Sequence, residues 1–295
     1  MSREKPKLRE SYFEKLTGMM RNISERINKE VKEKHGLKNF LSVDGALEMD
    51  GYVGDIYTAD QVNNDKTRIF EREYSFVNAG NEKVQQYYAE NYGADTPEKM
   101  IEYWRNFKKK EASGRTEMAI TGLLHKVLKD KFLVVRSAPH DDYDNGVDNI
   151  ILNKETGEVI CAFDEVHEGG AGDRTNKKVD KIKKVAARGG AEVRYGIKLE
   201  DKKLKRAAMK NIPVFYLGLN NDELANLLNN MDFNPDSPVT REENEIFTKL
   251  IASLEEQKKI LDAVNPPKPV KDKLNTFGSL VEEFKLRIAG RTGTA

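Results

Sequence analysis

Two neighbouring stretches, VDNIILN (147–153) and EVICAFDEV (158–166), decide the fold of this 295-residue chain. Each is a short run rich in branched apolar residues, which is typical of a buried β-strand. Glu155-Thr156-Gly157 lies between them and forms a turn, so the two strands are predicted to pair as a hairpin. A hairpin brings the start of its first strand beside the end of its second, although the two points are distant in sequence.

Acidic residues occupy those two points. Asp148 opens the first strand, and Asp164 and Glu165 lie near the end of the second. Converging carboxylates repel one another and therefore need a cation, and hard oxygen ligands suit Mg²⁺ or Mn²⁺. Such an ion can drive the hydrolysis of a phosphodiester bond. The alternative interpretation is that these acids are hydrated residues at strand ends.

The composition of the chain favours a protein with a heavily charged surface. Charged residues make up 34% of the chain and hydrophobic residues 38%. No apolar run approaches the roughly 20 residues that span a bilayer, and the N-terminus lacks the apolar segment of a signal peptide. The single cysteine, Cys161, excludes an intramolecular disulfide and a cysteine-rich zinc site. We therefore expect a soluble cytoplasmic protein without a membrane partner.

The formal net charge of +1 hides an uneven distribution of charge. Residues 136–173 contain ten acids and two bases, whereas residues 174–210 contain fourteen bases and four acids. An acidic pocket beside a basic surface suits a metal site that faces a polyanion. The alternative is a solvated amphipathic helix and loop, which is how most charge runs are arranged.

Helical patterns flank the hairpin region on both sides. We expect a mainly helical N-terminal region (1–113), an α/β core (114–220) and a helical C-terminal region (221–295). Apolar stripes at 13–31 and 247–264 either pack on the rest of the chain or form the seam of a homodimer. The predicted helices of the two outer regions are 8–36, 81–92, 97–112, 221–231, 240–264 and 272–289, and residues 68–77 are a candidate strand.

The core alternates between helix and strand. Its elements in order are a helix at 115–130, a strand at 132–138, the hairpin, a glycine-rich loop at 167–176, a basic helix at 177–188, a strand at 191–199, a short helix at 202–210 and a strand at 212–219. The order α-β-β-β-α-β-α-β predicts a mixed sheet flanked by helices.

This order and its acids resemble the PD-(D/E)XK nuclease superfamily, the restriction-endonuclease-like fold, over residues 114–219. Glu117 matches the glutamate on the helix before the first strand of the family, and Asp148 matches the metal-binding aspartate that opens its second strand. The third strand of the family carries an acid, one spacer and a lysine. Here that strand offers Asp164 followed by Val166, or Glu165 followed by His167.

Neither alternative supplies the lysine. Strand alternation puts Asp164 and Glu165 on opposite faces, and we favour Glu165 because His167 then keeps a polar group beside the acid. The lysine of the family could be replaced from the following helix, by Lys177, Lys178 or Lys181. Its absence from the strand equally indicates a site that has lost cleavage.

The resemblance implies a metal-dependent endonuclease that hydrolyses DNA, similar to restriction or repair enzymes. In this interpretation Lys178 stabilises the transition state, His167 acts as a base, and the basic residues after 173 hold the phosphate backbone. The alternative is a non-catalytic module that keeps the fold and binds nucleic acid or a protein. The candidate ligands for Mg²⁺ or Mn²⁺ are Glu117, Asp148, Asp164 and Glu165.

Two further segments have open interpretations. YWRNFKKK (103–110) mixes aromatic and basic residues, and its aromatic side chains either stack on nucleic-acid bases or face the core of the protein. His140, with Asp142 and Asp144, is either a transition-metal site or part of an ordinary loop.

Overall fold

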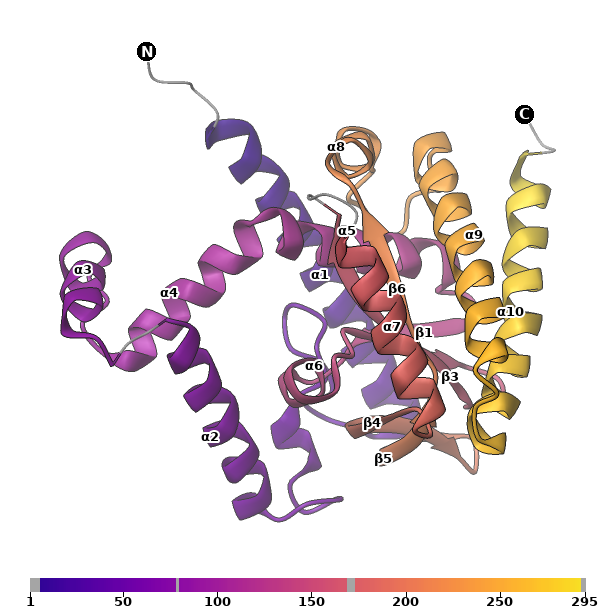
Figure 1. Cartoon of the computed structure of the whole chain (residues 1–295), viewed down its shortest axis with the longest axis horizontal. Helices are drawn as coiled ribbons and strands as arrows, with labels where there is room; N and C mark the ends of the chain where they lie inside the picture. The colour runs from indigo at the N-terminus through magenta and orange to yellow at the C-terminus, as the bar shows by residue number, and fades with distance from the viewer. Residues whose placement is uncertain (1–5, 78–79, 169–172, 293–295) are drawn as a thin grey trace.

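The computed structural model describes residues 6–77, 80–168 and 173–292, which form a mixed sheet surrounded by helices (Figure 1). In the described part of the chain the main sheet has the strand order β1 (Phe132–Arg136), β2 (Asn149–Asn153), β3 (Val159–His167) and β6 (Val214–Leu219). β2 is antiparallel to both β1 and β3, whereas β6 is parallel to β3. The predicted α/β class with a mixed sheet is therefore confirmed.

The hairpin of β2 and β3 forms as predicted, with Asn149 opposite Phe163. Gly157 in its turn has φ +70°, a left-handed conformation that favours glycine, and a Cβ there would collide with Leu199. Residues 150–152 and 160–163 are all at most 2% exposed. Both faces of the hairpin are thus covered, which explains its continuous apolar runs.

Helices α5 (Ala112–Leu128) and α7 (Asp173–Ala187) contact opposite faces of this sheet. The polar contacts of neighbouring strand residues establish this arrangement. Thr121 of α5 is hydrogen bonded to Asn149, on the Glu165 face, and Lys178 of α7 is hydrogen bonded to Asp164. The glycine-rich loop expected at 167–176 is shorter in the structure, because His167 belongs to β3 and residues 173–176 belong to α7. Residues 169–172, between these two elements, lie outside the described residues.

The terminal helices pack on this core. α1 (Pro6–His35) contacts α5, whereas α9 (Arg241–Ala263) and α10 (Lys268–Thr292) pair with each other and contact β6 and β3. α8 (Asn221–Asn230) also contacts α5. The two apolar stripes are buried inside the chain, so they are not available as the seam of a homodimer. Their buried members are Leu16, Met20, Ile23, Ile27 and Val31 in α1, and Phe247, Leu250, Leu254 and Leu261 in α9.

Three helices extend from one side of the molecule as an arm (Figure 1). The arm consists of α2 (Ala59–Phe76), α3 (Glu82–Tyr92) and α4 (Pro97–Lys110), and it has a small hydrophobic cluster of its own. The main hydrophobic core instead runs continuously from α1 to α10. The helices expected at 81–92 and 97–112 are thus present.

The candidate strand at 68–77 is wrong, because these residues belong to α2. A capping box of Thr58 and Gln61 starts the helix. Its inward face consists of Val62, Asp65, Ile69 and Glu73, at helical spacing. Two of these four residues are acids, so the helical period is hidden in the pattern of apolar residues.

The helix expected at 202–210 is also wrong. These residues form β5 (Lys203–Ile212), which pairs with β4 (Ala191–Glu200) in a separate two-stranded sheet. Asp201 and Lys202 make the turn with φ of 52° and 60°, a conformation normally marked by Asn or Gly. The pairing with β4 overrides the helical preference of the Lys-, Arg- and Ala-rich segment.

No helix in the described part of the chain is both long enough and apolar enough to cross a membrane.

Replacing Lys126 with Met is expected to lower the free energy of unfolding by about 3–5 kcal/mol, because Glu243 would remain charged and buried. Lys126 Nζ lies 2.7 and 2.8 Å from the two Glu243 carboxylate oxygens, and both side chains are fully buried. Chemical denaturation measures the loss. Lys259→Met, which removes a solvent-exposed pair with Glu256, is the control and should change stability little. Equal losses in the two variants would contradict this account.

Candidate functional site

The hairpin places Asp148 against the end of β3. Its backbone N–H donates to Phe163 O at 2.7 Å, and its carbonyl accepts from Ser137 N at 2.8 Å. Its carboxylate oxygen Oδ2 accepts from the backbone N–H of Glu165 at 2.5 Å. The side chain of Asp148 is therefore fixed at the point in β3 where Asp164 and Glu165 follow one another.

Asp164 points to the α7 side of the sheet. Its carboxylate accepts from Lys178 Nζ at 2.5 Å and from Lys181 Nζ at 3.1 Å, and the residue is 5% exposed. Lys181 passes over Gly146, where a Cβ would collide with its ammonium group. Two of the three predicted lysines thus contact a third-strand acid, although they come from a helix and not from the strand.

Glu165 points to the α5 side. One carboxylate oxygen accepts from the side chain of Asn149, which is itself hydrogen bonded to Thr121 at 2.9 Å. The other oxygen, Oε2, is buried and has no hydrogen-bond partner among the described residues. A buried carboxylate oxygen without a donor is costly, so this atom is suited to a ligand that the chain does not supply.

Glu117 extends from α5 towards the same group of acids. Its Oε2 lies 3.2 Å from Nη2 of Arg136, at the end of β1, and Arg136 also faces Asp44 at 3.8 Å. Burial, with smaller contributions from repulsion by Asp148 and Asp164, raises the pKa of Glu117, so the three carboxyls share one electrostatic environment. The structure therefore brings Glu117 together with the acids of the hairpin.

Asp142 is a fifth acid, which the sequence analysis did not include in the site. It lies on α6 (Pro139–Asn145), a short helix in the segment expected to be a loop, and its carboxyl is hydrogen bonded to Asp148. The sequence pointed to Asp142 only as part of the acidic run between two strands and as a companion of His140 and Asp144, not as a neighbour of Asp148. Glu117, Asp142, Asp148, Asp164 and Glu165 are called the acid cluster below.

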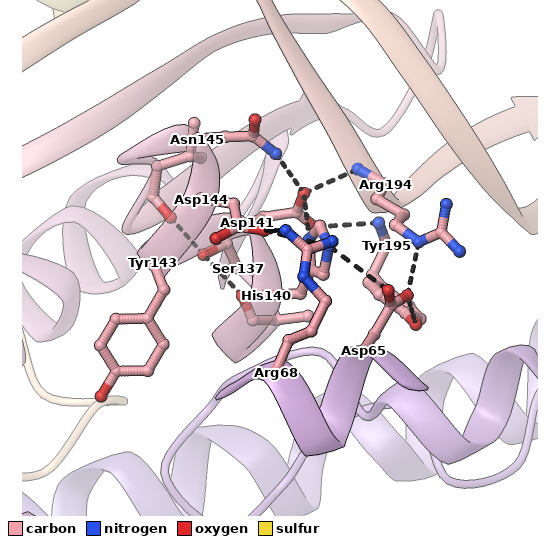
Figure 2. Close-up of polar contacts among 12 residues, drawn as sticks. Asp65, Arg68, Ser137, His140, Asp141, Tyr143, Asp144, Asn145, Arg194 and Tyr195 are labelled. Carbon is pink, nitrogen blue, oxygen red and sulfur yellow. Dashed lines mark hydrogen bonds and ion pairs between the residues drawn. The ribbon is translucent and has the colours of Figure 1, made fainter. Parts of the chain in front are cut away.

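A buried polar network holds α6, and therefore Asp142, in place (Figure 2). Asp141 is completely buried, and its carboxylate accepts from the backbone N–H groups of Arg194 and Tyr195 at 2.7 and 2.8 Å. It also accepts from Asn145 at 2.9 Å, within α6. Asp141 thus joins the helix to β4.

The same network reaches the arm. Asp65 of α2 accepts from Nε of Arg194 at 2.5 Å and from the hydroxyl of Tyr195 at 2.6 Å (Figure 2). His140 lies beside it, with Nε2 3.7 Å from Asp65 and 3.5 Å from Asp144. Asp144 is paired with two arginines of α2, and Asp65 with Arg194, so these two acids beside His140 already have cationic partners.

The carboxyls of the acid cluster have raised pKa values. Burial, with repulsion from neighbouring carboxylates, raises the pKa of Asp148 and of Glu165 well above the ordinary range. Burial likewise raises the pKa of Glu117 to about 7 and that of Asp142 to about 6, against the opposing effect of Arg136. Four carboxyls that resist ionisation in one place favour a divalent cation, which would stabilise their charged forms.

His167 ends β3 and shares a cleft with Glu165. Its Nδ1 lies 3.2 Å from the hydroxyl of Thr116. The cleft has a volume of about 710 Å³ and is lined by the end of β3, the α4–α5 junction and Asn221. We call it the His167 cleft. A second cleft, of about 760 Å³, lies between the arm and the core and reaches Arg136 and Asp142.

The acids are not arranged as a finished metal site. Among the described residues, no three acidic, histidine or cysteine side chains are placed so that they could hold one metal ion. Asp164 is engaged by two lysines, and Asp148 by Asp142 and the Glu165 N–H. The sequence therefore predicted four of the five acids that come together, whereas their present hydrogen bonds depend on α6 and α7.

No protein-family model, curated protein or solved structure matches the chain.

Without metal, the protein is expected to lose thermal stability as the pH rises from about 4.5 to about 7. In this range folded Glu117 retains a proton that the unfolded chain has released, so raising the pH favours unfolding. Glu117→Gln removes this ionisation and should make the fall shallower. Melting temperatures measured in EDTA across this pH range test the effect, with exposed Glu256→Gln as the control. An unchanged slope in Glu117→Gln would contradict the proposed burial of its charge.

Asp141→Ala is expected to cost about 3 kcal/mol of unfolding free energy, because the buried backbone N–H of Tyr195 and the part-buried N–H of Arg194 lose their acceptor. Asp141→Asn keeps one acceptor oxygen and should cost less. Denaturant titration compares both variants with Asp180→Ala, which removes a carboxylate exposed on α7. A loss in Asp141→Ala no larger than in the Asp180 variant would show that the network does not hold α6.

Proposed function

We propose that the chain is a metal-dependent endonuclease that hydrolyses phosphodiester bonds in DNA, with a restriction-endonuclease-like core formed by α5, β1, β2, β3, α7 and β6. The observation that carries the proposal is the acid cluster with a lysine bound to it. Asp148 and Glu165 lie together at one end of the sheet, Glu165 Oε2 has no donor among the residues that the structure describes, and Lys178 Nζ is 2.5 Å from Asp164.

The donor set fits Mg²⁺ or Mn²⁺. The acids supply carboxylate oxygens, the ligands that these hard cations prefer, and no soft ligand lies among them. Asp148 and Glu165 are the primary candidates to hold the ion, with Glu117 and Asp142 beside them. Binding would replace the hydrogen bond between Asp142 and Asp148, and would give Glu165 Oε2 a partner.

A bound divalent ion would supply Lewis-acid activation of the phosphate and of a water molecule. The chain itself would perform the remaining tasks. Lys178 and Lys181 are placed to stabilise negative charge that develops on the phosphate oxygens. Glu117, with a pKa raised by burial to about 7, is suited to accept a proton from the attacking water near neutral pH.

The outer face of α7 would hold the nucleic acid. Ile182 and Ala186 are buried against the protein, while four basic residues at helical spacing are exposed on the other side. These exposed residues are Lys177, Lys181, Lys184 and Arg188. A basic row that begins beside the acid cluster would guide a phosphate backbone across it, with an affinity that falls as salt rises.

A non-catalytic nucleic-acid-binding module is the second candidate. The observation that favours it is the lysine pairing of Asp164, together with the absence, in the described ranges, of three acids ready to share a metal. In that case the lysines of α7 would neutralise the acid cluster permanently. The same basic face would then bind nucleic acid without cutting it.

The decisive comparison is cleavage of supercoiled plasmid and of single-stranded circular DNA in Mg²⁺ or Mn²⁺. Wild-type protein is expected to cut at least one of them. Asp148→Asn should lower the rate by about 100-fold or more, because it removes a charge on which the metal and transition state depend. The control is Asp222→Asn, an exposed acid on α8, which should retain activity.

Wild-type protein that cuts neither substrate in either metal would overturn the endonuclease proposal. Salt-sensitive DNA binding by the same inactive protein would instead support the second candidate. Cleavage that survives Asp148→Asn at the wild-type rate would show that the activity does not come from the acid cluster.

A further inference from the structure

Phe107 is an aromatic side chain exposed in the His167 cleft. Along α4, Met100 and Ile101 are buried at 2% exposure and Trp104 is partly buried, yet Phe107 is 48% exposed. α4 leaves the small core of the arm and runs towards α5 (Figure 1), so its apolar stripe continues past the residues that cover it. Of the two interpretations of this segment, the one in which its aromatic side chains face the core does not hold for Phe107.

Basic side chains line the same cleft as this ring. They are Lys108, Lys110 and Arg115, and the acids Glu111 and Glu165 line the cleft with them. Lys108 Nζ is 2.9 Å from the Glu111 carboxylate. This ion pair holds Lys108 at the edge of the cleft. The cleft thus combines basic side chains, one exposed aromatic face and a member of the acid cluster.

Lys110 is held in a different way. Its ammonium group lies 5.6 Å from the centre of the Phe13 ring, so the side chain rests on α1 while its charge stays at the cleft. A fixed cation beside an exposed ring is the combination that single-stranded nucleic acid uses, since phosphates pair with the cations and bases stack on the ring.

The size of the cleft suits one nucleotide, and its exposed ring distinguishes between single-stranded and double-stranded DNA. Its volume of about 710 Å³ is in the range of sites that enclose one small ligand, such as a nucleotide. A base inside a duplex has both faces covered by its neighbours, so it offers no face to Phe107. Only a base that is unpaired and unstacked, in a single strand or at a flipped position, can use this ring.

We propose that the His167 cleft binds an unpaired nucleotide, with Phe107 stacked on its base and Lys108 and Lys110 contacting the phosphates beside it. This inference rests on the proposed function, because it places the nucleotide next to Glu165 and the acid cluster. It defines the substrate class as single-stranded or locally unpaired DNA. Phe107 is then a specificity-determining residue that takes no part in the chemistry.

The test is equilibrium binding in EDTA, followed by fluorescence anisotropy of a labelled single-stranded oligothymidylate and of a labelled DNA duplex. Phe107→Leu is expected to weaken single-strand binding by about 10-fold or more, which is the size of a lost base–aromatic stack, and to leave duplex binding nearly unchanged. Phe107→Trp keeps an aromatic ring and should bind the single strand about as tightly as wild type does. Because Phe107 is exposed, neither variant should disturb folding.

Tyr87→Leu is the matched control, since Tyr87 is 53% exposed on α3 and does not line the cleft. Both forms of DNA should bind this variant as they bind wild type. The inference is overturned if Phe107→Leu weakens single-strand and duplex binding equally, if it weakens neither, or if wild type binds no single strand. Binding without metal-dependent cleavage would defeat the endonuclease proposal alone, whereas cleavage without a Phe107 effect would defeat this inference alone.

Discussion

The pairing of β2 with β3 is the constraint on which the rest of the site depends. The backbone hydrogen bond from Asp148 N–H to Phe163 O aligns the start of one buried strand with the end of the other. That register brings acids from distant points of the chain to one sheet end. Burial of the hairpin on both faces raises the free energy of the charged carboxylates, so they must either keep a proton or lie beside a cation.

Different elements balance this charge on the two faces of the sheet. On one face, α7 contributes Lys178 and Lys181 to Asp164. On the other, Arg136 faces Glu117, while in the described part of the chain the Glu165 carboxylate accepts a hydrogen bond from the side-chain amide of Asn149 alone. The α5 face is therefore the less neutralised of the two, and it is also the face from which Glu165 reaches the His167 cleft.

Local patterns predicted the hairpin, because its apolar runs and glycine turn are encoded within about twenty residues of one another. They failed where a partner is distant in sequence. The buried face of α2 uses Asp65, whose partner Arg194 lies 129 residues away, and β5 is a strand only because β4 pairs with it. For the same reason Asp142 could not be assigned to the site, since α6 docks through contacts to β4.

Direct measurement of Mn²⁺ binding tests the central claim that the acid cluster is a divalent cation site. Electron paramagnetic resonance of free Mn²⁺, titrated with protein near neutral pH, gives the number of bound ions without any substrate. The account predicts that wild type binds Mn²⁺ and that Asp148→Asn and Glu165→Gln each lose this binding. Wild-type protein that leaves Mn²⁺ free, or two variants that bind it as well as wild type, would contradict the claim.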